Sequence, residues 1–491
     1  MHRCTDRQPF RSSSRGPSRG PSRGRSSSAW RAVAQTGFAL AALVPALAWA
    51  YCDDPADLRS GRPVLPDTQA FSASELFDGP TQGNGLAQLG TLARGAVSGS
   101  ADARSAEHNG RAAGFDLVQT QAGGKPQIGL NGSVGVGQSV VDGVTKSVGG
   151  IGSVGINASA PLYDGGKLDE LTDYRRRLVG AGESAVSAAR ERAVREAVLT
   201  VIDRNRYRLQ LKVYQQYVTK LACLSKSIEQ IVAQDRGRAS ELVQARKGMR
   251  QAEIARDEAQ AFLRQADGRL RRLVGENVEP WGAVGVPLID LPELNAMYDQ
   301  INHSPEVRQL TLQAQALDNL ARATAADRSP QVRWQVGANA GRSAQVNSGA
   351  WNAGLALSYT LDDGGTVAAA TSAARERAEA ARRALEFTIN ERAKQVGTLH
   401  DAARSAFLRA RHYAGVLQDS DQLRNSTFEQ WSKLGRRSLF DLISAENEHY
   451  QLRVAYVNAL HDGFGASAQL RNAGSGLLPW VAPELLAPPP R

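Results

Sequence analysis

The sequence has few of the residues that build disulfide scaffolds, metal centres or active sites. Its 491 residues include three cysteines, Cys4, Cys52 and Cys223, which are too few for a disulfide framework. The seven histidines are scattered, and no two of them have the spacing of metal ligands. There is also no Walker motif, no nucleophile elbow and no pair of acidic residues in a cleft-like context. The sequence therefore predicts no enzyme, no metal site and no cofactor.

Positive charge is concentrated at the N-terminus rather than spread along the chain. The formal net charge is +10, but residues 1–31 alone contain eight arginines and a single acidic residue, Asp6. This first segment is of low complexity, with arginine, serine, glycine and proline throughout. The remainder of the chain is only weakly basic, so the high pI does not indicate a nucleic-acid partner.

An apolar run at residues 32–50 follows the basic segment and ends in Ala48-Trp49-Ala50. A basic start, an apolar centre and small residues at the cleavage point are typical of a secretory signal peptide. We therefore assign residues 1–50 to a basic low-complexity segment and signal peptide. A permanent N-terminal anchor is the alternative, but the run contains Pro45 and no stop-transfer pattern follows it.

The stretch after the predicted cleavage point, residues 51–84, is rich in proline, glycine, serine and aspartate. Such a composition predicts an extended, loosely held N-terminal segment. Cys52 stands at its start, where a lipid would be attached in a lipoprotein. Lipidated cysteines prefer a small residue before them, and Tyr51 is large, so we do not expect a lipid at Cys52.

Residues 126–162 have the alternating pattern of a β-hairpin, with strands predicted at 126–137 and 149–162. Apolar side chains occupy alternate positions of these strands, namely Ile128, Leu130, Val134, Val136, Val154, Ile156, Ala158, Ala160 and Leu162. Because side chains alternate across a strand, each arm has an apolar face and a small, polar face. The pattern fits a membrane barrel, although a soluble β-sandwich shows it too.

The hairpin occurs twice. A second pair of strands, predicted at 331–341 and 350–361, repeats the alternation. The repeat extends into the sequence that follows, because Leu162-Tyr-Asp-Gly-Gly166 returns as Leu361-Asp-Asp-Gly-Gly365 roughly 200 residues later. A period this long indicates a duplicated domain rather than a solenoid of short repeats.

Two long helices complete the duplicated unit, at residues 168–234 and 367–431. No proline interrupts either helix, and at about 1.5 Å per residue each is on the order of 100 Å long. A helix of this length exceeds a globular core and needs neighbours along its whole length, as in a coiled-coil tube. Each copy thus reads helix, strand, strand, long helix, helix.

These elements predict a fold that is mainly α with a transmembrane β-barrel. The expected units are a first repeat at 85–275, a connector at 276–300, a second repeat at 301–472 and a disordered C-terminal tail at 473–491. Four strands from one chain cannot close a membrane barrel, and an open edge in lipid leaves backbone groups without partners. We therefore expect a homotrimer in contact with lipid, in which three copies supply twelve strands.

With these features in place, the sequence resembles the TolC family of trimeric outer-membrane efflux and secretion ducts, over roughly residues 85–475. The motifs are the two strand-to-helix turns, the two glycine-containing helix tips and the stretch Leu434–Tyr450. The turn residues are Pro161, Asp164, Gly165, Gly166, Asp363, Gly364 and Gly365. The resemblance implies a twelve-stranded barrel in the cell outer membrane and a twelve-helix α-barrel in the periplasm. Its periplasmic end would open when an adaptor and an inner-membrane pump dock on the tips.

The resemblance also implies roles for residues at the periplasmic tips. One acidic position of the family's gate ring matches Asp441, and the other, one turn later, is Ser444 here. The tip arginine of the closing network matches Arg437, and its acidic partner matches Glu241, beside Ser240. The adaptor-docking tips would consist of Gly237, Arg238, Leu434, Gly435 and Arg436.

Simple electrostatics is compatible with these roles and also with an alternative interpretation. Three Asp441 carboxylates at a constriction would attract cations and repel anions. A surface Glu241–Arg437 pair contributes about 0–1 kcal/mol, so three such pairs would bias the tunnel shut without locking it. In the alternative interpretation, Asp441 is an ordinary acidic residue of a helix first turn and the tip charges are solvated. Ser432, where the family has an aromatic residue, and Ser444 predict a weaker latch and a less selective ring.

Three functions stay open from the sequence. The first is a passive exit duct for type I secretion of a large protein, such as a toxin or an adhesin, because the stretch Leu434–Tyr450 looks closest to that branch of the family. Its partners would be a periplasmic adaptor and an inner-membrane ABC exporter. The second is the same duct in a multidrug efflux pump, with a proton-driven partner. The third is a periplasmic coiled-coil scaffold or adhesin without a pore, which the four alternating strands argue against.

Overall fold

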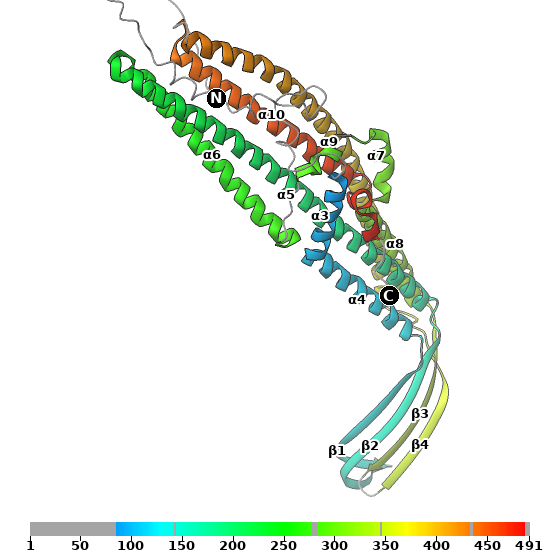
Figure 1. Cartoon of the computed structure of the whole chain (residues 1–491). Helices are drawn as coiled ribbons and strands as arrows, with labels where there is room; N and C mark the ends of the chain where they lie inside the picture. Colours follow the sequence, from blue (N-terminus) through cyan, green and yellow to red (C-terminus); the bar gives the residue numbers. More distant parts are fainter. Residues whose placement is uncertain (1–84, 142–143, 277–281, 344–345, 433–435, 487–491) are drawn as a thin grey trace, which may run out of the picture. The chain divides into compact units, whose positions relative to one another are not determined.

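The computed structural model describes residues 85–141, 144–276, 282–343, 346–432 and 436–486 (Figure 1). The signal peptide expected at 1–50 and the extended segment expected at 51–84 lie outside the described residues.

The order of helices and strands is duplicated, as the sequence pattern indicates. The first copy contains α3 (Gly85–Gly99), α4 (Ala101–Ala122), β1 (Gln127–Val141), β2 (Val144–Tyr163), α5 (Lys167–Gln234) and α6 (Ala239–Val274). The second copy contains α7 (Leu294–Gln300), α8 (Pro305–Ala325), β3 (Gln331–Ser343), β4 (Val346–Ser358), α9 (Thr366–Ser432) and α10 (Leu439–Ala473). The two long helices, α5 and α9, have 68 and 67 residues, so each measures about 100 Å.

The four strands form one antiparallel sheet in the order β1-β2-β3-β4. The register places Leu130 opposite Ile156, and Ile156 opposite Ala338, which in turn pairs with Trp351. The alternate apolar positions of all four strands therefore lie on one face of the sheet. That face is strongly exposed in the single chain, with Val134 at 93% and Trp351 at 80%. An apolar face of this extent is typical of a surface covered by lipid or by another protein.

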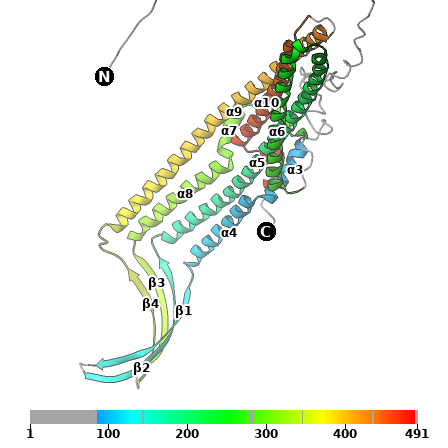
Figure 2. The same ribbon diagram turned by 90° about the vertical axis from the view of Figure 1, so that its left-hand side faces the viewer.

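The helices lie side by side in two successive groups of four. Near the sheet, α4, α5, α8 and α9 follow one another (Figure 2), and each neighbouring pair is in contact. Farther from the sheet, α6 replaces α4 and α10 replaces α8 (Figure 1). Small side chains allow α6 to pack closely against α5. Helix α6 buries alanine at every seventh position, at Ala245, Ala252, Ala259 and Ala266. A seven-residue repeat is the spacing of a coiled-coil seam.

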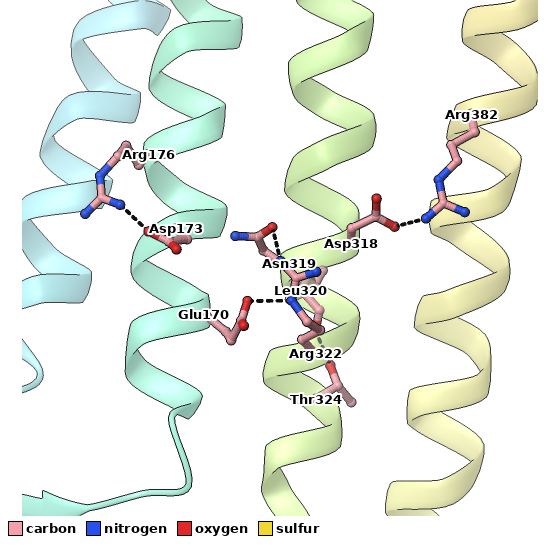
Figure 3. Close-up of polar contacts among 9 residues, drawn as sticks. All are labelled: Glu170, Asp173, Arg176, Asp318, Asn319, Leu320, Arg322, Thr324 and Arg382. Carbon is pink, nitrogen blue, oxygen red and sulfur yellow. Dashed lines mark hydrogen bonds and ion pairs between the residues drawn. The ribbon is translucent and has the colours of Figure 1, made fainter.

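Near the sheet, ion pairs connect α8 to the long helices on either side of it (Figure 3). Arg322 of α8, in the second copy, contacts Glu170 of α5, in the first copy, at 2.9 Å. From the same helix α8, Asp318 pairs with Arg382 of α9. The helix α8 thus binds the long helix of each copy through side chains of opposite charge.

The two strand-to-helix turns are capped in the same way. Asp164 accepts hydrogen bonds from the backbone N–H groups of Gly166 at 3.0 Å and Leu168 at 2.8 Å. In the second copy, Asp363 accepts from Gly365 at 2.8 Å and Val367 at 2.7 Å. These carboxylates satisfy donors at the starts of α5 and α9 that have no partner within the helix. The same contacts hold the pKa of Asp363 below its usual range. Pro161 lies at the end of β2, where the register with β3 shifts.

We expect Gly165→Ala to destabilise the protein more than Gly364→Ala does, by about 1–3 kcal/mol. Both glycines have positive φ, at 69° and 63°. A methyl group at position 165 would overlap the side chain of Ser329, whereas nothing lies within 4 Å of one at position 364. The check is the thermal unfolding midpoint of each purified variant. Equal losses would show that the backbone conformation alone, and not Ser329, requires glycine.

The sequence predicts a disordered C-terminal tail at 473–491. This prediction is wrong as far as residue 486, because the segment is folded. Residues 478–486 form the short helix α11 (Leu478–Val481) and the 3-10 turn η6 (Pro483–Leu486). Leu477 and Leu478 are fully buried, and Arg471 stacks over the ring of Trp480 at 4.0 Å. Residues 487–491 lie outside the described part of the chain.

A buried carboxylate fixes this C-terminal segment. Glu191 of α5 accepts hydrogen bonds from the backbone N–H groups of Leu477 and Leu478 and from the side chain of Asn472. Burial raises the pKa of Glu191, while these donors favour its ionised form. The glycines and prolines of the segment give it the composition that is typical of a disordered tail. Its folding depends on a partner that lies almost three hundred residues earlier in the sequence.

Candidate functional site

The first helical hairpin, α5 and α6, turns at residues 235–238. Asp235 accepts a hydrogen bond from the backbone N–H of Gly237 at 2.9 Å, which closes the turn. Arg238 pairs with Glu241 at 2.8 Å, three residues along the same tip. Ser240 is exposed at the start of α6. The tip therefore presents one paired acidic side chain and an exposed, glycine-containing turn.

The second hairpin, α9 and α10, has a capping box at the start of α10. The hydroxyl of Ser438 accepts a hydrogen bond from the backbone N–H of Asp441 at 3.2 Å, and the carboxylate of Asp441 accepts from the N–H of Ser438 at 3.1 Å. This reciprocal pair stabilises the first turn of the helix. In this chain Asp441 is thus a capping residue, as the alternative interpretation holds. Its role in a ring depends on neighbouring copies and stays a prediction, as does that of Ser444, which is exposed one turn later.

The structure does not bring the two expected latch residues together within one chain. Arg437 donates through Nε to the side chain of Gln430 at 3.2 Å, whereas Glu241 pairs with Arg238. Arg436 is exposed, and its backbone N–H donates to the carbonyl of Gln430 at 3.1 Å. Leu434 and Gly435, which were expected at the second tip, lie outside the described residues. A latch between neighbouring copies stays a prediction.

Polar contacts run along the seam where α5 of the first hairpin meets α10 of the second. The contacting pairs, in order toward the tips, are Arg206 with Asp462 at 2.7 Å, Gln210 with Asn458 at 2.6 Å, Gln216 with Arg453 at 2.9 Å and Tyr217 with Asn447 at 3.3 Å. The rings of Tyr217 and Tyr450 also stack, with centroids 4.6 Å apart. These contacts recur from Arg206 to Tyr217 of α5, so they form a ladder of polar pairs between the two hairpins.

A buried ionic cluster continues this ladder toward the tips. Glu446 of α10 is 1% exposed and lies 3.6 Å from Lys220 of α5 and 3.6 Å from Arg424 of α9. Arg424 is itself 3% exposed and also pairs with Asp421 at 2.6 Å. Charges removed from water require such partners, because an uncompensated buried charge costs several kcal/mol. The cluster therefore ties α5, α9 and α10 together near the tips of the two hairpins.

A groove of about 380 Å³ lies beside the seam, between α5, α6 and α10. Its lining includes Tyr214, Lys247, Ser444 and Asn447. Ser444 thus lies at a groove between the two hairpins, in addition to its predicted place in the gate ring.

The described residues contain no group of three or more His, Cys, Asp or Glu side chains arranged to hold a metal ion. Among the helices that the structure describes, none combines the length and the apolar character that crossing a bilayer requires.

Sequence reasoning missed the ionic cluster, although Glu446 lies in the stretch that carried most of the family resemblance. The next three residues are also polar, namely Asn447, Glu448 and His449. The local sequence therefore does not distinguish a buried glutamate from an exposed one. The signal that could have identified the cluster is the position of Glu446 on α10 relative to the apolar residues of that helix. Glu446 lies four residues after the buried Leu442 and four before the buried Tyr450, and thus on the packed face of that helix.

Comparisons with known proteins support the fold. The Campylobacter jejuni CmeC outer membrane channel is 15% identical, with a TM-score of 0.69 over 79% of this chain and 86% of that chain. The outer membrane protein VceC from Vibrio cholerae is 16% identical, with a TM-score of 0.67 over 79% and 96% of the two chains. A structure of CusC gives 19% identity and a TM-score of 0.70 over 84% and 98%. At these identities the likeness shows the fold alone.

Family membership comes from the sequence itself. No curated protein sequence matches the chain. The sequence model of the outer membrane efflux protein family, however, matches residues 92–276 and 296–474, which span most of both repeats. This match confirms the predicted resemblance to TolC-like channels. The chain therefore belongs to the outer membrane efflux protein family, whose members are channels of the cell outer membrane with a helical tunnel in the periplasm.

Proposed function

We propose that three copies of this chain close into a twelve-stranded barrel in the outer membrane and a twelve-helix tunnel in the periplasm. The observation that carries this proposal is the sheet, which has one exposed apolar face along all four strands. In one chain β1 and β4 each pair on one side only. An edge of this kind in lipid must find a partner, and pairing β4 of one copy with β1 of the next provides it.

The duct would be passive, with its energy supplied by an inner-membrane partner through a periplasmic adaptor. Type I secretion of a large protein, such as a toxin or an adhesin, is the function we favour, with an ABC exporter as the pump. The support is the sequence of the stretch Leu434–Tyr450, which looks closest to the type I secretion branch of the family. Drug efflux with a proton-driven pump is the second candidate, favoured by the efflux description of the family that the chain matches.

Two measurements test the proposal. Extraction of outer membranes in mild detergent, followed by mass measurement of the assembly, should give three copies of the processed chain. A water-soluble monomer would contradict the barrel. In a deletion strain, loss of one secreted protein with unchanged drug susceptibility would support secretion, whereas increased drug susceptibility with normal secretion would support efflux.

We expect Arg437→Ser to raise single-channel conductance in planar bilayers by about twofold or less. A surface ion pair contributes only about 0–1 kcal/mol, so losing three of them would shift the closed state modestly. Arg436→Ser is a matched control, because the neighbouring Arg436 is equally exposed and has no predicted place in the latch. If the two variants conduct alike, Arg437 does not hold the tunnel closed.

A further inference from the structure

The charged residues of the four strands are all basic. As the structure bounds them, β1 to β4 contain Lys146, Arg333 and Arg342 and no acidic residue. Arg333 precedes Trp334 of the apolar face by one residue, so it lies on the opposite, polar face of the sheet, as does Gln335. Arg342 is an even number of residues from Trp334 and lies on the apolar face. Arg333 is therefore the charge that β3 contributes to the polar face.

Arg333 lies at the end of the sheet that adjoins the helices (Figure 2). The strand β3 begins at Gln331, and Arg333 pairs with Pro161 of β2 and with Ala356 of β4. Neither of these two neighbours carries a charge, and Arg333 is exposed. Because an arginine side chain keeps its proton in proteins, a fixed positive charge stands at this point of the polar face.

The rest of the polar face carries uncharged amides that lie along the sheet. A methyl group added to Gly129 of β1 would be 3.1 Å from the amide oxygen of Asn157, its partner on β2. One added to Gly337 of β3 would be 3.0 Å from the amide oxygen of Asn352, its partner on β4. These asparagine side chains therefore lie over the glycine of the neighbouring strand. The surface around Arg333 is consequently uncharged and has little relief.

We propose that the three Arg333 side chains of the trimer, here called the arginine ring, bind multivalent anions with phosphate or carboxylate groups at the junction of barrel and tunnel. This inference rests on the proposed trimer, whose barrel turns the polar face inward. Twelve strands that are about 4.8 Å apart and tilted by about 40° form a wall about 12 Å from the axis. Side chains that extend inward from this wall bring their charges within about one Debye length of the axis, which is about 10 Å at 0.1 M salt. The three positive charges therefore act across the whole lumen, and each guanidinium can donate two hydrogen bonds to one anion.

The carboxylates of the turns beyond this end of the sheet have partners of their own. Asp164 and Asp363 accept hydrogen bonds from backbone N–H groups at the starts of α5 and α9. Asp362 accepts one from the backbone N–H two residues later, and Asp327 pairs with Lys167. The starts of helices carry partial positive charge, which the carboxylates at the turns offset. The arginine ring lies inside the sheet, where its neighbours on β2 and β4 are uncharged.

The test is block of single-channel current in planar bilayers of neutral lipid, with tripolyphosphate added on the side of the barrel in 0.1 M KCl. The wild-type current should be blocked, and Arg333→Gln should raise the half-blocking concentration by about tenfold or more, because three charge-assisted contacts are lost. In 1 M KCl the Debye length shortens to about 3 Å, so the block of the wild type should weaken. Equal half-blocking concentrations for wild type and Arg333→Gln, or block from the tip side alone, would overturn the proposal.

Matched variants separate the charge from its position. Arg333→Lys keeps the charge and should retain most of the block, whereas Arg342→Gln removes a charge from the apolar face of the same strand and should be blocked like the wild type. Arg333→Ser, which resembles the serines of the polar face, replaces Arg333→Gln if that variant gives no channels. A failure of the trimer is recognised separately, because the wild-type protein itself would then give no conductance steps.

Discussion

Glu446→Gln should lower the stability of the helical tunnel by about 3–5 kcal/mol, the usual effect of removing one partner from a buried ion pair. The glutamine is nearly the same size, so the change removes charge without opening a cavity. Lys220 and Arg424 would then share the interior without the carboxylate that lies 3.6 Å from each of them. Thermal melting followed by circular dichroism at 222 nm, in the same detergent as the wild-type protein, measures the loss.

A matched control separates burial from charge. Glu448 lies two residues farther along α10 and is exposed, so Glu448→Gln should change the melting temperature little. Adding Lys220→Met to Glu446→Gln should recover part of the loss, since the buried ammonium that lost its carboxylate is then removed, while Arg424 keeps Asp421. Equal melting temperatures for the variants at positions 446 and 448 would show that the cluster contributes nothing to the fold.

The elements of this fold could be predicted from the sequence because their periods are simple. Alternation with a period of two identified both hairpins, and the register places those alternate positions on one face. The Asp-Gly-Gly motifs marked the strand-to-helix turns, where Gly165 and Gly364 adopt positive φ. Each of these signals is local, so neighbouring residues were enough to interpret it.

Contacts between distant segments could not be predicted in this way. Helix α10 is packed against α5 and α9 and buries residues around much of its circumference, so no single apolar stripe identifies which polar residues are inside. The C-terminal segment was misjudged for the same reason, because its composition is that of a tail and its partner Glu191 lies on α5. The predicted gate depends on contacts of another kind, because Asp441 and Arg437 would act on residues of neighbouring copies and not on residues of their own chain.

A second large effect is expected from pH, through His461 of α10. This side chain is fully buried, and its Nδ1 lies 2.8 Å from the carbonyl oxygen of Val457. Burial lowers its pKa to about 3, with a smaller contribution from Arg206 and Arg208, which face it from α5. Around it, Asp462 pairs with Arg206, and Phe464 stacks edge-on at 5.5 Å. The imidazole is therefore neutral in the folded protein.

The direction of the pH effect follows from the two protonation states. In the unfolded chain the imidazole takes up a proton below about pH 6.5, whereas in the folded chain it does so only near pH 3. The contribution of His461 is therefore fully present above pH 6.5 and is lost as the pH falls toward 3. The expected slope is about 1.4 kcal/mol per pH unit, which amounts to about 3 kcal/mol at pH 4.5.

His461→Gln isolates this contribution, because glutamine is polar and does not titrate. The difference in unfolding free energy between wild type and variant should be constant from pH 7 to 8 and should shift in favour of the variant by about 3 kcal/mol at pH 4.5. His412→Gln is the control, since His412 is exposed on α9 and its replacement should leave the pH profile unchanged. Parallel profiles for wild type and His461→Gln would mean that the pKa of His461 is the same in the folded and unfolded chains. The imidazole would then be protonated in the folded protein at pH 4.5. The seam between α5 and α10 would then accommodate a third positive charge beside Arg206 and Arg208.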